Sequence, residues 1–200
     1  MAGYSRENAG GVLLSHVNLD QAEELLVEMA PGIKRPAMMF NPDTAPYAHS
    51  YYLPSFADAA RSLNVEPMPA PVRSDSEIEA VIAALGREPG GGLIVMADYF
   101  TQVHVAPIIL LSAQHRVPAI YPWSYVVAQK GGLLSYGPDL TDVVRRGAPY
   151  VDRILRGAKP ADLPVQFPIK FEMAVNIKTA KALGLNTPLS ILLRADEVIE

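Results

Sequence analysis

The chain has 200 residues, of which 50% are hydrophobic and 19% are charged, and its formal net charge is −4. This composition is typical of a globular protein with one sizeable core or two small lobes, and it has no basic excess that would indicate nucleic-acid binding. The lack of cysteine excludes disulfides, thiol catalysis and Cys-based zinc sites, and no apolar run reaches the ~18 residues that a membrane-spanning helix needs.

The first half of the chain alternates short apolar runs with longer amphipathic ones. The helix at 74–86 has the clearest pattern, with Ser74 or Asp75 as its N-cap and apolar residues at positions i, i+3, i+4 and i+7. A Pro-rich extended segment at 65–72 is unsuited to the middle of a sheet. The remaining elements expected here are strands at 11–17, 35–40 and 92–97 and helices at 18–32 and 51–64.

The second half continues the same alternation. The expected elements are helices at 103–115, 124–129, 139–157 and 177–185, strands at 117–121, 133–137 and 170–176, and a C-terminal segment at 188–200. Strands and helices in this order favour βαβ units. The sequence therefore predicts an α/β fold, a three-layer sandwich in which helices cover both faces of a mainly parallel sheet.

Polar and aromatic residues follow three of the expected strands, in "FNPDTAPY", "ADYF" and "YPWSY". Because parallel strands end at one edge of a sheet, these three loops are expected to form one binding edge for a small molecule. The carboxylate of Asp98 suits a ligand ammonium or hydroxyl group, or it caps the following helix, and the two roles are compatible. The candidate ligand-binding residues are Asn41, Thr44, Tyr47, Asp98, Tyr99, Phe100, Tyr121 and Trp123.

Signatures of catalysis are missing from the sequence. There is no phosphate-binding loop and no G-x-S-x-G motif, and the four histidines lack metal-ligand spacing. An acid–base pair of Asp98 and His104 is the one arrangement that an enzyme of doubly wound fold would use, but nothing supplies a nucleophile or a metal. We therefore expect no catalytic residue, no cofactor and no metal.

Five stretches are similar to a known family: "KRPAMMFNPDTAP", "GGLIVMADYF", "KGGLLSYGPDL", the run from Tyr150 to Leu185 and the closing "LLRADEVIE". Together they resemble the ABC transporter substrate-binding proteins of the tryptophan/tyrosine-binding-like family, from about Leu25 to Glu200. The resemblance implies a type I periplasmic binding protein, in which two α/β lobes joined by a hinge close on a small solute such as an amino acid. It also implies an ABC transporter permease as a partner and a periplasmic location.

The chain departs from this family at its beginning. Family members are longer and start with a leader and the first half of lobe 1. The N-terminal "MAGYSRENAGG" has no basic region followed by an apolar core, so it predicts no signal peptide. If the chain were complete as given, the expected location would be the cytoplasm.

The resemblance divides the chain into four parts. These are a lead-in at 1–34, the ligand-binding lobe 2 at 35–137, a helix and return segment of lobe 1 type at 138–169, and a C-terminal hinge strand with helices at 170–200. The helix at 139–157 would then lack its usual sheet, and its apolar face predicts a homodimer. Besides a solute-binding protein, the sequence leaves open the Asp98/His104 enzyme and a structural dimer that no longer binds a solute.

Overall fold

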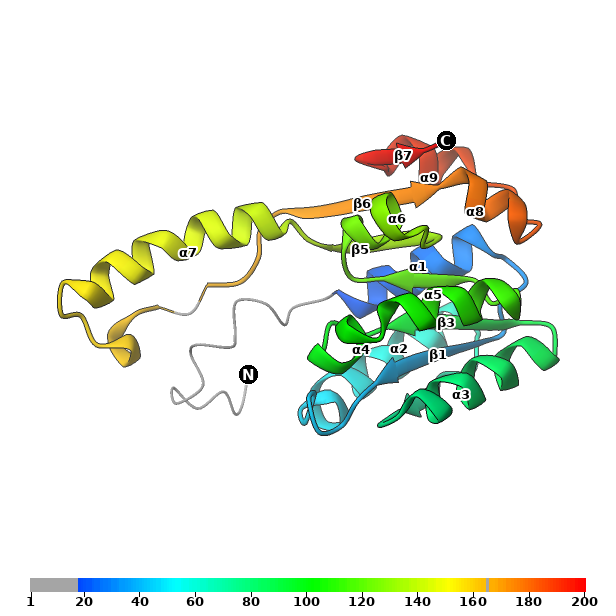
Figure 1. Ribbon diagram of the computed structural model, residues 1–200, viewed down its shortest axis with the longest axis horizontal. Helices are drawn as coiled ribbons and strands as arrows, with labels where there is room; N and C mark the ends of the chain where they lie inside the picture. The colour runs from blue at the N-terminus through cyan, green and yellow to red at the C-terminus, as the bar shows by residue number, and fades with distance from the viewer. Residues whose placement is uncertain (1–17, 165) are drawn as a thin grey trace. The chain divides into compact units, whose positions relative to one another are not determined.

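A computed structural model of the chain describes residues 18–164 and 166–200 (Figure 1). The strand expected at 11–17 lies outside the described residues. The described residues form two compact units: the sheet unit comprises 18–137 and 172–200, and the α7 unit comprises 138–164 and 166–171.

The sheet has seven strands in the order β2-β1-β3-β4-β5-β6-β7. Strands β2, β1, β3, β4 and β5 are parallel neighbours, and β7 is parallel to β6. β6 runs antiparallel to β5, because Asn176 donates its N–H to Leu133 O at 2.9 Å while Ala174 donates to Ser135 Oγ at 3.2 Å. The strands are β1 (Arg35–Phe40), β2 (Met68–Pro71), β3 (Gly91–Val95), β4 (Ala119–Tyr121), β5 (Leu134–Pro138), β6 (Phe171–Asn176) and β7 (Glu197–Ile199).

Helices cover both faces of this sheet, as Figure 1 shows. α1 and α2 pack together on one face, and α1 also contacts α9; on the other face α3 packs on α5 and α5 on α6. The predicted three-layer α/β fold is confirmed. The helices of the sheet unit are α1 (Leu19–Met29), α2 (Leu53–Leu63) with the preceding π-helical turn Ala48–Tyr52, α3 (Asp75–Arg87), α4 (Tyr99–Val103), α5 (Val105–Gln114), α6 (Ser124–Lys130), α8 (Ile177–Ala182) and α9 (Leu189–Arg194).

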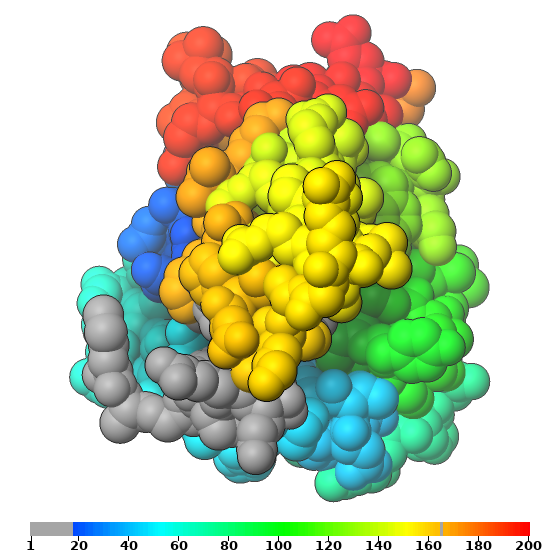
Figure 2. Space-filling view, turned by 90° about the vertical axis from the view of Figure 1, so that its left-hand side faces the viewer, coloured from blue at the N-terminus to red at the C-terminus, as the bar shows by residue number. Residues whose placement is uncertain are grey.

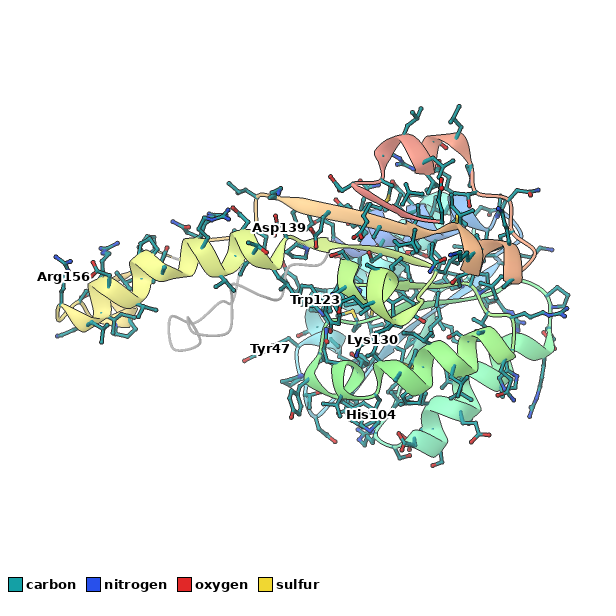
Figure 3. All side chains as sticks on the ribbon, turned by 45° about the horizontal axis from the view of Figure 1, so that its top comes forward. Tyr47, His104, Trp123, Lys130, Asp139 and Arg156 are labelled. Carbon is teal, nitrogen blue, oxygen red and sulfur yellow. The ribbon has the colours of Figure 1, made fainter. Side chains whose placement is uncertain are left out.

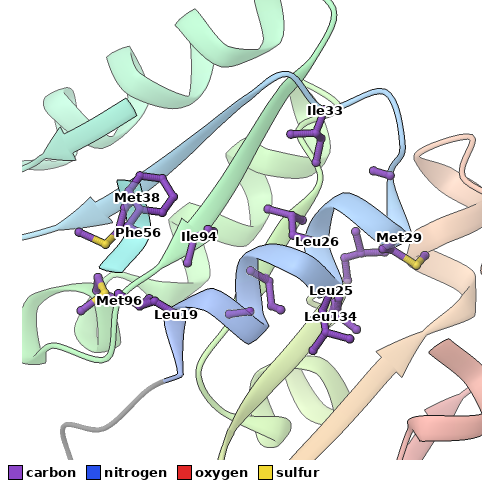
Figure 4. Close-up of a cluster of buried hydrophobic side chains, with 14 of the residues drawn as sticks. Leu19, Leu25, Leu26, Met29, Ile33, Met38, Phe56, Ile94, Met96 and Leu134 are labelled. Carbon is purple, nitrogen blue, oxygen red and sulfur yellow. The ribbon is translucent and has the colours of Figure 1, made fainter. Parts of the chain in front are cut away.

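The main core lies between the sheet and α1 (Figure 4). Leu19 and Leu26 of α1 pack with Met38 of β1 and with Ile94 and Met96 at β3, and all five side chains are buried. Burying each such side chain stabilises the fold by roughly 1.5–3 kcal/mol. The first turn of α1 therefore supports the strand end from which the β3–α4 loop departs.

The Pro-rich segment at β2 and the N-cap of α3 have the structures that their sequences predict. The Pro-rich β2 lies at the edge of the sheet, where the missing N–H groups of Pro69 and Pro71 cost little. Ser74 caps α3, accepting the N–H of Glu77 at 3.3 Å.

Two predicted helix boundaries were wrong. Gly86 was expected to end α3, but the helix continues to Arg87. A Cβ at Gly86 would lie 2.6 Å from the carbonyl oxygen of His115, so this glycine serves the close approach of α3 to the end of α5. The helix expected at 103–115 is α5, which begins at Val105, and the short helix α4, which the sequence did not predict, precedes it and meets it at His104.

The α7 unit contains the helix α7 (Leu140–Leu155) and the 3₁₀ turn Pro160–Asp162. Asp139 caps α7, accepting the N–H of Asp142 at 3.1 Å, and its other carboxylate oxygen accepts a 2.6 Å hydrogen bond from Lys170 Nζ. This bond from Lys170 lowers the pKa of Asp139. Figure 2 shows the α7 side chains, in yellow, at the surface of that view. The exposed apolar residues of the unit are Val144, Val151, Ile154, Leu155, Phe167 and Ile169.

Candidate functional site

The three loops singled out in the sequence leave the same edge of the sheet. β1, β3 and β4 are adjacent and parallel, so the segments after Phe40, Val95 and Tyr121 all begin at their carboxyl ends. Figure 3 shows Tyr47 and Trp123 at this end of the sheet unit. We call the loops 41–47, 96–102 and 122–125 the carboxyl edge.

Asp98 holds two of these loops together. Its Oδ1 accepts the backbone N–H of Thr101 at 2.9 Å, which caps α4, and the hydroxyl of Thr44 at 3.1 Å. Its Oδ2 accepts the backbone N–H of Asn41 at 3.1 Å. The carboxylate is buried, and three donors from the protein surround it. Of the two roles predicted for Asp98, the helix cap is present, and the same carboxylate also joins the β1 loop to the β3 loop.

The β1 loop is shaped by its own side chains. The buried Asn41 accepts the backbone N–H groups of Asp43 and Thr44 on its Oδ1, at 2.8 and 3.3 Å. Thr44 is exposed, but its hydroxyl donates to Asp98 Oδ1. Tyr47 is 54% exposed.

The predicted aromatic residues after β3 differ in their surroundings. Tyr99 is 76% exposed. Phe100 is half-buried and stacks on the imidazole of His104, with ring centroids 4.1 Å apart. His104 Nδ1 lies 2.8 Å from Phe100 O and its Nε2 lies 3.3 Å from Asp75 Oδ1. Among the described residues there is therefore no hydrogen bond between Asp98 and His104. The acid–base pair that the enzyme hypothesis required is not formed.

The two candidates from β4 are both buried. Tyr121 is 2% exposed and its side chain lies inside the layer between the sheet and α6, where a Cβ at Gly132 would be 3.0 Å from its ring. Burial raises the pKa of Tyr121, so the phenol is neutral. Trp123 is 7% exposed, and its indole N–H has no acceptor among the described residues. A buried donor without an acceptor is unfavourable for the folded state. The indole N–H of Trp123 can therefore still donate one hydrogen bond.

Sequence reasoning missed four polar residues, three at the carboxyl edge and one, Glu172, beside it. The hydroxyl of Tyr125 donates to Gln102 Oε1, and the hydroxyl of Ser124 donates to Glu172 Oε1 at 2.5 Å. Ser124 and Tyr125 lie within "YPWSY" and Gln102 lies two residues after "ADYF", so their polarity was the available signal. Glu172 gave no local signal, because only the antiparallel pairing of β6 with β5 brings it to this edge.

Two kinds of feature are missing from the described residues. Within 18–164 and 166–200, no three His, Asp or Glu side chains gather in a way that would hold a metal ion. None of the helices in this part of the chain is both long and apolar enough to cross a membrane.

The chain is similar in sequence to one family of known proteins. A family model described as "ABC transporter substrate binding protein" matches residues 3–199. No curated protein matches the chain in sequence.

Three solved structures are similar in fold. A conserved domain protein from Vibrio cholerae is 22% identical with a TM-score of 0.81, covering 92% of this chain and 61% of its own. An ABC domain from Streptococcus pneumoniae, solved in complex with L-Trp, is 22% identical with a TM-score of 0.81, covering 94% and 64%. The ligand-free, open structure of a substrate-binding protein with adhesive properties from Clostridium difficile is 20% identical with a TM-score of 0.63, covering 92% and 61%. The chain thus spans less than two thirds of the length of each.

Proposed function

The chain belongs to the ABC transporter substrate-binding protein family, and on this premise we propose that it captures a small solute at the carboxyl edge for an ABC-type importer. The family match confirms the resemblance noted in the sequence. The proposed solute is an amino acid or a related small molecule, a choice supported by the neighbour solved in complex with L-Trp. The proposed role involves no covalent chemistry.

The observation that carries this proposal is the Asp98 junction. In open parallel sheets, ligands bind beyond the carboxyl ends of the strands, at the point where the strand order reverses. Here the order β2-β1-β3 reverses between β1 and β3. The loops that leave these two strands are the ones that Asp98 joins through Asn41, Thr44 and Thr101.

We propose distinct roles for the candidate residues. Tyr47, Tyr99, Phe100 and Trp123 offer apolar faces together with O–H and N–H donors, which suits a small amphipathic solute. Asn41, Thr44 and Asp98 fix the conformation of the loops, and Tyr121 supports the edge from the core. Asp98 is thus a positioning residue in this account.

We further propose that solute capture uses a second lobe. The similar structures are longer than this chain, and a second lobe would be the counterpart against which the binding lobe closes. An ABC transporter permease is the proposed partner. An extracytoplasmic location is the proposed site of action, because solute-binding proteins of importers act on that side of the membrane.

A thermal-shift screen tests the proposal. Amino acids, sugars and carboxylic acids are added separately to the purified chain, because a solute that binds only the folded state raises its melting temperature with concentration. We expect at least one solute to raise it in a saturable way. Native mass spectrometry of the same sample should then show one solute per chain. The proposal fails if no solute in the set shifts the melting temperature.

A further inference from the structure

Glu172 lies beside the carboxyl edge, although it belongs to the antiparallel strand β6. Because Asn176 pairs with Leu133 and Ala174 lies beside Ser135, the same register puts Glu172 beside Gly137. A Cβ at Gly137 would lie only 1.9 Å from Pro122 O, so the backbone after β4 passes directly against this point. Glu172 is therefore next to the start of α6, which its hydrogen bond to Ser124 confirms.

The carboxylate of Glu172 has spare acceptor capacity. Among the described residues it accepts one hydrogen bond, from the Ser124 hydroxyl at 2.5 Å, and it forms no ion pair there. Other carboxylates of this region are already engaged, since Asp98 accepts three hydrogen bonds and Asp43 pairs with Arg73 at 3.3 Å. Glu172 is half-buried, so its charge is partly desolvated without a compensating cation. A bound cation would offset that cost through charge-assisted hydrogen bonds.

The groups beside Glu172 add apolar surface and a second polar function. Trp123 directly precedes Ser124, and its buried indole N–H has no acceptor among the described residues. A solute with an apolar body packs against aromatic side chains, and the buried indole N–H would meet an acceptor on the solute only if the groups that cover it move. The surroundings of Glu172 thus match an amphipathic amine.

We propose that Glu172 anchors the protonated amine of the solute, an inference that rests on the proposed solute-binding function. The recognised class is an apolar primary amine, with or without a carboxylate. Glu172 accepts two hydrogen bonds at most on its free oxygen, and Ser124 fixes the orientation of the carboxylate by occupying the other. The residue that selects the solute is then on β6, outside the three loops that follow β1, β3 and β4.

An NMR titration of the 200-residue chain tests this proposal. Trp123 is the only tryptophan, so one indole N–H signal reports on this part of the edge. The probes are phenethylamine, L-phenylalanine and 3-phenylpropionate, which carry the amine alone, both groups and the carboxylate alone. NMR detects binding with millimolar affinity. This range is needed because the 200-residue chain is shorter than the similar structures and would bind a solute without a second lobe. We expect phenethylamine and L-phenylalanine to shift the indole signal, and 3-phenylpropionate to bind at least about tenfold more weakly.

The isosteric variant Glu172→Gln removes the charge and keeps an oxygen for Ser124. We expect it to weaken phenethylamine about tenfold or more and to abolish the preference for amines. Glu79→Gln, on the exposed surface of α3, is the matched control and should leave all three titrations unchanged. Retained amine preference in Glu172→Gln, or no binding of any amine probe to the wild type, overturns the anchor. The solute-binding proposal survives that result if the thermal-shift screen finds a solute without an amine.

Discussion

At the scale of single residues, the sequence around Asp98 predicts one of its hydrogen bonds but not the other two. Its place after a buried strand and before a helix predicted the cap on Thr101, because that rule involves neighbours in sequence. The hydrogen bonds from Asn41 and Thr44 cross more than fifty residues and depend on the pairing of β1 with β3. The sequence predicted that these residues share an edge, but it did not predict that three donors would bind the Asp98 carboxylate.

This arrangement predicts the effect of Asp98→Asn. An amide can accept from Thr101 on one side, but its NH₂ group then faces the N–H of Asn41, and two donors meet. We expect the free energy of unfolding to fall by about 1–3 kcal/mol, and solute affinity to fall with it because the loops lose their junction. Urea unfolding measures the first effect, with Asp58→Asn on the exposed surface of α2 as the control. An unchanged unfolding midpoint would contradict the junction.

Glu23 is a second residue whose environment the sequence conceals. It is fully buried on α1, and neither carboxylate oxygen has a partner among the described residues. Burial raises its pKa from 4.5 to about 8. The acids of α1 otherwise follow the expected pattern, since Glu24 is exposed and Glu28 pairs with Arg194 of α9.

The raised pKa of Glu23 predicts a pH-dependent stability. Between pH 4.5 and about 8 the folded state holds a proton that the unfolded state has released, so the free energy of unfolding falls as the pH rises. The slope approaches about 1.4 kcal/mol per pH unit in that window and vanishes above it. Denaturant unfolding from pH 5 to 9 should show this loss for the wild type relative to Glu23→Gln. Glu24→Gln, the exposed neighbour, should follow the wild type; parallel curves for wild type and Glu23→Gln would refute the prediction.

At the scale of elements, the sequence predicted most strands and helices because their patterns are local. β1 has the predicted bounds, and β3, β4, β5 and β6 differ from them by one or two residues at an end. Contacts between elements that are far apart in the sequence could not be predicted from local patterns. Gly86 was read as a helix stop, whereas it accommodates the end of α5, and Tyr121 was read as part of the edge, whereas its side chain packs under α6.

Two glycines, one closely packed and one without neighbours at its Cβ position, test whether packing between elements sets the role of a glycine. Gly137→Ala would put a Cβ 1.9 Å from Pro122 O, so we expect β5 to shift against the β4 loop and the melting temperature to fall. Gly147, inside α7, has nothing within 4 Å of its Cβ position. Gly147→Ala should therefore stabilise α7 by roughly 0.5–1 kcal/mol, because alanine loses less entropy in a helix. Circular dichroism melts of both variants measure these effects, and equal shifts would contradict the packing at Gly137.

At the scale of the whole molecule, the exposed apolar side chains of α7 lead to a prediction about assembly. Val144 is 72% and Leu155 81% exposed, and Val151 and Ile154 lie on the same helix. Apolar surface of this kind is commonly covered by another chain. We expect a homodimer in which α7 is protected, and Leu155→Glu to shift it towards monomer. Multi-angle light scattering showing a wild-type monomer at tens of micromolar, a concentration at which ordinary oligomers persist, would contradict the prediction.

The central claim is that the sheet unit binds a solute at its carboxyl edge. Backbone amide shift mapping, with the solute that most raises the melting temperature, tests it most directly. We predict that the largest shifts fall in the carboxyl edge, at 41–47, 96–102 and 122–125, after β1, β3 and β4. Shifts confined to the opposite ends of these strands, where Arg35, Gly91 and Ala119 begin them, would contradict the claim.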